Sequence, residues 1–164
     1  MIKQWLRPVM RPAIRWLLYF YYDTHCVMGS GGALQIGKKV ATSNTLFNVS
    51  SGSIIVGDYT IFGQNVMVLT GKHRFTGGKR AGLKEAMSGG SWGGGCQEVP
   101  CSGFDIKIGS GCWIASGAII SGGVTIGDNA IIAAGSVITR DVADHCIVAG
   151  IPGRPIGDTR QIQH

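Results

Sequence analysis

Residues 108–143 read IGSGCWIASGAIISGGVTIGDNAIIAAGSVITRDVA, and this stretch repeats every six residues. An isoleucine opens each unit, and the fifth residue of each unit is also small or apolar. The opening residues are Ile108, Ile114, Ile120, Ile126, Ile132 and Ile138, and the fifth residues are Cys112, Ala118, Val124, Ala130, Ser136 and Val142. The second residue is small in every unit. A repeat this regular predicts a solenoid, in which each unit stacks on its neighbours.

The period of six also predicts the local structure. Six is a multiple of the strand period of two, so the first and fifth residues of a unit face the same side of an extended segment. The small second residue suits a corner, where a side chain has little room. An α-helix, with 3.6 residues per turn, would place residues six apart on different faces. We therefore expect an all-β solenoid with short sides, tight corners and a stacked aliphatic interior.

The repeats resemble those of the hexapeptide-repeat acyltransferases, and most of all the sugar O-acetyltransferases of the galactoside and maltose type. The resemblance runs from about Leu34 to Ile156 and includes the closing segment Gly150-Ile151-Pro152-Gly153-Arg154. It implies a left-handed parallel β-helix with three faces per coil. It also implies acetyl-CoA as the co-substrate, no metal, and a homotrimer with CoA sites between adjacent subunits.

The chain divides into three parts on these grounds. Residues 34–156 form the predicted β-helix, and residues 157–164 follow it as a frayed tail. Residues 1–33 precede it, and within residues 1–22 four cations recur every four positions among apolar residues: Lys3, Arg7, Arg11 and Arg15. This pattern is typical of a cap over the open end of a solenoid or of an anchor on a membrane surface. We expect a cytoplasmic protein, with residues 1–22 as the candidate for peripheral contact with the inner face of the membrane.

The composition of the chain limits which binding partners and which cellular compartment we expect. The formal charge of +6 suits an anionic partner such as a phosphorylated cofactor, an acidic glycan or a membrane surface. No nucleic-acid-binding motif is visible, so a nucleic-acid partner is not expected. The five cysteines are odd in number and irregularly spaced, which argues against a disulfide framework and favours a reducing compartment. Cys96 and Cys101 lack the second pair that a zinc site would need.

The repeat is weaker before residue 56. Ile36, Thr42 and Asn48 keep the spacing of six but not the aliphatic identity, and the register then slips by two residues before Val56. The resemblance places an asparagine near the acceptor sugar in this region, and Asn44 and Asn48 both fit it.

Regularity stops at His73 and resumes only near Ile108. Because Ile108 follows Val68 by forty residues, which is not a multiple of six, residues 74–104 must leave the solenoid at one corner. Loops this long in a compact domain usually carry function. We interpret this one as a lid over a cleft, with a flexible spacer as the alternative.

His73 is the candidate catalytic residue. It stands last in its unit, beside an inward position assigned to Lys72, so its side chain is predicted to point outward. The segment Thr70-Gly71-Lys72-His73 resembles the one that carries the catalytic histidine in the sugar O-acetyltransferases. By that resemblance His73 removes the proton from an acceptor hydroxyl, which attacks the acetyl-CoA thioester. A positioned base of this kind accelerates a reaction by about 10² to 10⁴.

The resemblance also implies a set of residues that contact CoA: Trp113, Ser116, Ala134, Thr139, Arg140 and Arg154. Arginine pairs well with phosphate through charge-assisted hydrogen bonds, which suits Arg140 and Arg154 to a polyanionic carrier. The alternative for both is an ordinary solvated surface charge.

Together these residues predict an acetyl-CoA-dependent O-acetyltransferase that acts on a sugar in surface polysaccharide or O-antigen synthesis. Three alternatives stay open: an N-acetyltransferase for amino sugars, an acetyltransferase for a xenobiotic, and a non-catalytic β-helix scaffold. A zinc hydratase on the same fold would need about three histidines on neighbouring coils. The four histidines are badly spaced for that: His25, His73, His145 and His164.

Overall fold

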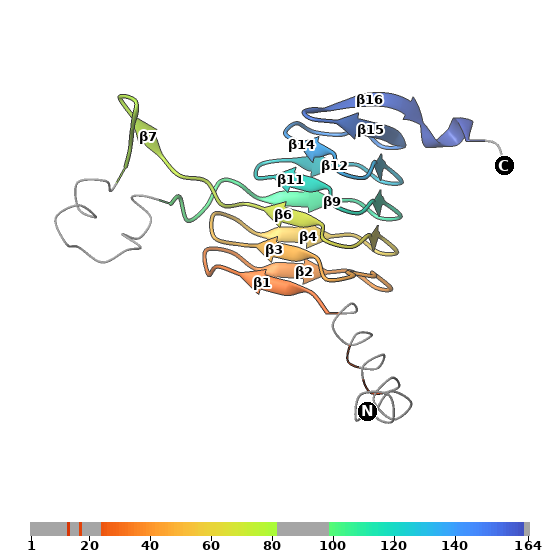
Figure 1. Ribbon diagram of the computed structural model, residues 1–164, viewed down its shortest axis with the longest axis horizontal. Coiled ribbons are helices and arrows are strands. Elements are labelled where there is room, and N and C mark those ends of the chain that lie inside the picture. The colour runs from red at the N-terminus through yellow and green to blue at the C-terminus, as the bar shows by residue number, and fades with distance from the viewer. Residues whose placement is uncertain (1–12, 14–16, 18–23, 82–98, 163–164) are drawn as a thin grey trace, which may run out of the picture.

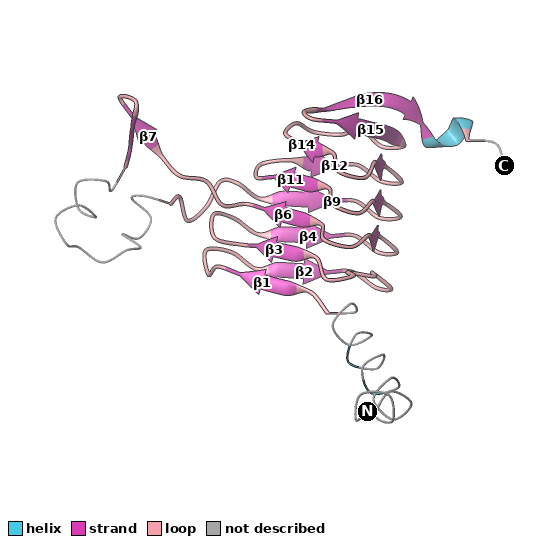
Figure 2. Cartoon of the chain, in the orientation of Figure 1, coloured by secondary structure: helices cyan, strands magenta, loops and turns pink. Residues whose placement is uncertain are grey.

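The computed structural model describes residues 13, 17, 24–81 and 99–162, and Figure 1 shows them as a stack of short parallel strands with one excursion. The cap or anchor expected in residues 1–22 lies almost entirely outside the described residues, as does the middle of the long loop. Nearly all regular structure in the described part is strand (Figure 2). The all-β prediction is confirmed.

Three of the four sheets in the described residues each make one side of a prism, and the fourth is a two-stranded hairpin in the long loop, Phe75–Thr76 with Lys79–Arg80. Sheet A holds β1 (Cys26–Met28), β3 (Leu46–Asn48), β6 (Met67–Leu69), β11 (Ile119–Ser121) and β14 (Val137–Ile138). Sheet B holds β2 (Leu34–Ile36), β4 (Ile54–Val56), β9 (Ile106–Ile108) and β12 (Thr125–Ile126). Sheet C holds β5 (Ile61–Phe62), β10 (Trp113–Ile114), β13 (Ile131–Ile132), β15 (Cys146–Gly150) and β16 (Gly153–Asp158). The chain visits B, C and A in turn, so three sides complete one coil.

Every pairing between successive coils is parallel and keeps the repeat in register. Ile108 lies beside Ile126, and Ile114 beside Ile132. The six opening isoleucines are each at most 2% exposed, and the six fifth residues are buried as well. Burying one such side chain contributes about 1.5–3 kcal/mol, so the stacked interior is the main source of stability. Burial also raises the pKa of the Cys112 thiol, which sits at one of these inward positions.

Carboxylates join the coils at the corner between sheets B and C. The Asp58 carboxylate accepts a hydrogen bond from the Lys38 backbone N–H at 2.7 Å. Asp128 accepts from the Ser110 N–H at 2.8 Å, and Asp144 accepts from the Asp128 N–H at 2.9 Å. In this way backbone N–H groups at the corners, which have no partner within a strand, donate hydrogen bonds to aspartate side chains of the next coil.

The expected register before residue 56 is wrong by one residue on sheet A. Phe47, not Asn48, is the inward residue of β3, and it pairs with Val68 of the next coil. The shift arises because the spacing between inward residues is irregular here. Phe47 follows Thr42 by one residue less than a regular unit, and Val56 follows Phe47 by three residues more. Asn48 is therefore placed at the edge of the prism instead of inside it.

Both ends of the predicted β-helix differ from expectation. β1 lies upstream of residue 34, and its pairing with β3 extends sheet A toward the N terminus. At the other end, β16 runs antiparallel to β15, and a 3₁₀ helix, η1 (Thr159–Gln161), follows it. The Asp158 carboxylate caps η1 by accepting from the Arg160 backbone N–H and pairs with the Arg160 guanidinium. Residues 157–162 are thus ordered, and the prediction of a frayed tail is wrong for them.

One cysteine also differs from expectation. Cys101, at the C-terminal root of the long loop, is disulfide-bonded, whereas Cys26, Cys112 and Cys146 are free. The odd count and irregular spacing did not indicate this bond, because a single disulfide needs no framework of evenly spaced cysteines.

Candidate functional site

The candidate site follows one edge of the prism, where sheet A gives way to sheet B. We call this the A–B edge and define it as residues 49–53, 70–72, 122–124 and 139–141, which follow β3, β6, β11 and β14. The long loop leaves at residues 70–72, as predicted for a corner, and its hairpin projects from this edge in Figure 1. Leu69 pairs with Ser121, and Ile120 pairs with Ile138. The start of the loop after β6 is therefore two strands away from Thr139, which follows β14. Two strand spacings amount to roughly 10 Å.

Hydrogen bonds fix the start of the loop. The Thr70 hydroxyl, which is fully buried, donates to the Asn48 carbonyl at 2.8 Å and accepts from the Ser51 N–H at 3.1 Å. The Lys72 N–H donates to the Ser51 hydroxyl at 3.4 Å. Lys72 itself is exposed, so the inward position assigned to it is wrong: the last inward residue of this coil is Thr70. The chain therefore leaves the core after Thr70, before the inward position that the repeat predicts at Lys72.

His73 is exposed, as predicted, directly after this anchored segment. Of the two candidate asparagines, Asn48 is the one that lies beside this segment, next to Gly71. The Asn48 side-chain Nδ2 lies 3.3 Å from the position that a Cβ on Gly71 would occupy, and its Oδ1 accepts from the Ser50 N–H at 2.9 Å. Asn44 instead exchanges hydrogen bonds with Asn65 at 3.0 and 2.8 Å, on a different corner.

The other end of the loop returns to the same edge. Lys72 Nζ lies 5.2 Å above the centre of the Phe104 ring, a cation–π contact between the two roots. A Cβ on Gly122 would lie 2.8 Å from the Thr70 carbonyl oxygen and 3.0 Å from the Phe104 Cβ. Only glycine leaves room at this corner for both chain ends to pass.

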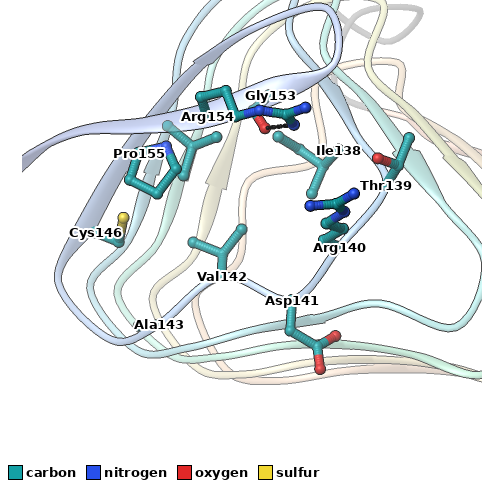
Figure 3. A pocket seen from close by; sticks show the side chains of 11 residues that line it. Ile138, Thr139, Arg140, Asp141, Val142, Ala143, Cys146, Gly153, Arg154 and Pro155 are labelled. Carbon is teal, nitrogen blue, oxygen red and sulfur yellow. Dashed lines mark hydrogen bonds between the residues drawn. The ribbon is translucent and has the colours of Figure 1, made fainter.

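A pocket of about 320 Å³ borders residues 139–141 of this edge at the C-terminal end of the prism, and it brings three predicted CoA residues together: Thr139, Arg140 and Arg154 (Figure 3). Ile138, Val142 and Val148 give the pocket an apolar side. The Arg154 guanidinium donates to the Gly153 carbonyl at 3.0 Å, a bond within β16. The pocket therefore combines two cations with an apolar wall, which suits a carrier that has both phosphates and an alkyl arm.

Besides Ala143, four further residues line this pocket that are not among the predicted CoA contacts: Asp141, Cys146, Gly153 and Pro155. Asp141 is bound to the Thr125 N–H at 2.7 Å, and the pKa of the Cys146 thiol is raised by burial and by nearby Asp158. Three of the four come from β15 and β16. The antiparallel return of β16 breaks the six-residue repeat, so periodicity alone contained no signal for this wall.

The remaining predicted CoA residues do not line the pocket. Trp113 lies on the outer face of sheet C, 53% exposed, between Ile61 and Ile131 in register. Ser116 and Ala134 are exposed at the corner between sheets C and A, where the Ser116 hydroxyl accepts from the Gln64 N–H at 3.1 Å. Within one chain, the predicted CoA residues thus form two separate groups.

The described residues contain neither a candidate metal site nor a candidate membrane span. No group of three or more histidine, cysteine or acidic side chains is close enough there to hold a metal ion. In the same residues, no helix has both the length and the apolar character needed to cross a bilayer.

The repeats match the family model for the bacterial transferase hexapeptide (six repeats) over residues 105–140. A maltose O-acetyltransferase from Clostridium difficile 630 superposes with a TM-score of 0.55 at 26% identity, covering 83% of this chain and 67% of its own. The chain has the hexapeptide-repeat acyltransferase fold. This confirms the left-handed parallel β-helix predicted from the resemblance.

Sequence relatives of this hexapeptide-repeat chain are acetyltransferases. The galactoside O-acetyltransferase of Escherichia coli K12 is 49% identical over 53 residues, which cover 32% of this chain and 26% of that protein. The galactoside O-acetyltransferase of Lactococcus lactis is 27% identical over 122 residues, 74% of this chain and 51% of that protein. The chain spans about half the length of the curated relatives that it matches over most of its own length.

A further solved structure shares the hexapeptide-repeat fold. A hexapeptide-repeat acetyltransferase from Vibrio cholerae, in complex with acetyl-CoA, has a TM-score of 0.61 at 23% identity, covering 90% of this chain and 78% of its own. At this identity the likeness shows the fold alone.

Proposed function

We propose that this chain is an acetyl-CoA-dependent O-acetyltransferase that transfers acetyl to a sugar hydroxyl in surface polysaccharide or O-antigen synthesis. One observation carries the proposal: the pocket with Arg140 and Arg154 and the anchored segment before His73 lie along the same edge of the prism, roughly two strand spacings apart. An extended thioester carrier bound along this edge would have its phosphates at the arginines and its acetyl end toward His73.

The residues of the pocket fit acetyl-CoA as the donor. Arg140 and Arg154 would hold phosphate oxygens by charge-assisted hydrogen bonds, and Ile138, Val142 and Val148 would contact the apolar arm. Acetyl-CoA supplies an activated acyl group, which an oxygen nucleophile can attack without a metal. The relatives named above, including one whose structure holds acetyl-CoA, support this choice of donor.

His73 would act as the general base. Its imidazole takes the proton from the acceptor hydroxyl as the oxygen forms a bond to the acetyl carbon, and the carbon–sulfur bond then breaks. The same imidazole returns the proton to the departing thiolate sulfur, so protons and charge balance over the cycle. Asn48, which lies beside Gly71, would orient the acceptor. Asn44, held on another corner by Asn65, is assigned a structural role.

Three further features belong to this proposal. The active form is a homotrimer with CoA sites between subunits. Residues 1–22 cap the first coil or hold the enzyme on the inner face of the membrane, near a lipid-linked acceptor. The enzyme is cytoplasmic and takes no nucleic acid as a partner.

The test separates donor binding from chemistry. His73→Ala should lower acetyl transfer to a panel of sugars by about 10² to 10⁴, because the hydroxyl loses its base, while CoA binding by calorimetry stays unchanged. The double variant Arg140→Ala/Arg154→Ala should lose CoA affinity instead. His145→Gln is the matched control, since His145 contacts Thr159 at the C-terminal end of the coil and not the A–B edge.

Three results would contradict the proposal. Full activity of His73→Ala would remove this histidine from the mechanism. Transfer only to amino groups or to a drug hydroxyl would replace the sugar substrate. Absence of CoA binding by the intact chain would leave a β-helix scaffold without catalysis.

A further inference from the structure

The hairpin β7–β8 follows His73 after a single residue. β7 (Phe75–Thr76) and β8 (Lys79–Arg80) pair antiparallel, with Phe75 opposite Arg80 and Thr76 opposite Lys79. Gly77 and Gly78 make the turn with φ of +58° and +74°, as a two-residue type I′ turn requires. The Ala81 N–H donates to the Arg74 carbonyl at 2.8 Å and closes the ribbon. The structure thus places a short, hydrogen-bonded hairpin next to the candidate base (Figure 1).

Positive charge collects on this segment. Lys72 and Arg74 flank His73, and Lys79 shares a face of the hairpin with Arg74, because alternate residues of a strand and residues in register point the same way. All three are exposed. Residues 70–81 contain no aspartate or glutamate. At the other described root of the loop, the Asp105 carboxylate is already bound to the Ser53 N–H at 2.6 Å.

This group of cations is separate from the one that CoA would use. Arg140 and Arg154 line the pocket above the loop root, whereas Lys72, Arg74 and Lys79 lie at and beyond His73. A carrier whose phosphates occupy the pocket leaves the second group on the acceptor side of the base. Like charges kept together at an exposed site attract an anion and raise its local concentration. A neutral sugar would make no use of that field.

Phe75 adds an apolar surface to the same hairpin. Its side chain is 67% exposed, which is unusual for a large aromatic side chain on a short ribbon. An aromatic ring can cover the apolar face of a sugar ring while polar groups at its rim remain solvated. Register places Phe75 beside Arg80, on the face of the ribbon opposite Arg74 and Lys79. The hairpin therefore offers an acidic sugar an apolar platform on one face and the group of cations on the other.

We infer that hairpin β7–β8, together with Lys72, selects acceptors that carry a negative charge, either a carboxylate or a phosphate, on or next to the acetylated sugar. This inference rests on the proposed function and deepens it by naming the acceptor class. Exposed cations act weakly one at a time and are screened by salt, so selection comes from the group and is strongest at low ionic strength.

The experiment compares three galactose derivatives that have the same free hydroxyls and differ only in the substituent at the first carbon: methyl galactoside, carboxymethyl galactoside and galactose 1-phosphate. The wild-type chain should show a kcat/KM about tenfold higher for at least one anionic acceptor than for the methyl glycoside at low salt. Arg74→Gln/Lys79→Gln should bring the ratio of kcat/KM between the anionic acceptor and the methyl glycoside close to one, without changing kcat/KM for the methyl glycoside itself. Salt at about 0.5 M should lower the ratio of the wild-type chain in the same way. Lys38→Gln, on the corner between sheets B and C, is the control and should keep the ratio.

Each outcome decides something. A preference for only one of the two anions identifies whether carboxylate or phosphate is recognised. Equal kcat/KM for all three acceptors, or a ratio that survives the double variant, overturns the inference and leaves the proposed sugar acetyltransferase standing. Transfer to none of the three by a wild-type chain that binds CoA overturns both.

Discussion

Single polar residues decide where the regular coil ends and the site begins. Thr70 is buried at the place that Gly122 takes in the next coil, and its hydroxyl is bound to the backbone of residues 48 and 51. A buried hydroxyl without partners would cost roughly 1–3 kcal/mol. The bonds to the earlier coil therefore hold the chain at the point where it turns outward, and they fix the backbone that leads to His73.

Asn48 gives the first prediction at this scale. Asn48→Ala should raise the KM for the acceptor, or lower kcat, by about tenfold, because the variant loses the amide next to Gly71 that we propose orients the acceptor. Steady-state kinetics check this, and CoA affinity should not change. Asn44→Ala is the matched variant: it should lower the melting temperature, since Asn44 has φ of +53° and bonds to Asn65, while KM stays the same. Equal kinetics in both variants would contradict the assignment of Asn48.

At the scale of elements, the agreement between sequence and structure follows the repeat. From Ile106 to Ile138 each strand could be predicted, because every inward position is small or aliphatic and a shift of one residue would expose the whole set. On sheet A the inward Phe47 was missed, since the polar corners beside it have irregular lengths that periodicity does not reveal. For the wall of the pocket from β16, Arg154 was predicted from the family resemblance alone, because an antiparallel return has no counterpart in a parallel repeat.

The C-terminal element leads to a prediction about pH. The Arg160 side chain, by its hydrogen bonds, lowers the pKa of the Asp158 carboxyl to about 2 from its ordinary value of 3.8. An acid whose pKa is lower in the folded state stabilises the fold above its unfolded pKa and loses that effect as the pH falls through the folded one. The contribution of Asp158 should therefore be complete above about pH 4 and disappear toward about pH 2.

Carbon-detected NMR titration of the Asp158 carboxyl checks this directly. The midpoint should lie near the low value in the wild-type chain and move up toward the ordinary range in Arg160→Gln, which removes both guanidinium hydrogen bonds. An unchanged midpoint in Arg160→Gln would show that the side-chain pair does not form in solution.

At the scale of the whole molecule, the two groups of predicted CoA residues argue for assembly. Thr139, Arg140 and Arg154 line the pocket at the A–B edge, whereas Trp113 and Ser116 lie on sheet C and the corner after it. A single rigid prism cannot bring these surfaces together. Two prisms side by side can, if the C face of one meets the A–B edge of the next. A closed ring of three such heterologous contacts gives the proposed trimer, with each CoA site made by two chains.

The outer face of sheet C makes this arrangement testable. Ile61 and Trp113 are each 53% exposed and adjacent in register, an apolar surface that a partner chain would cover. Light scattering should give the mass of three 17.3 kDa chains for the wild type. Trp113→Glu should give a smaller species and lose CoA binding together with the trimer, because a carboxylate cannot be buried there without a partner. Ile55→Glu, on the outer face of sheet B, should keep both. A Trp113→Glu monomer that still binds CoA with wild-type affinity would place the whole CoA site within one chain.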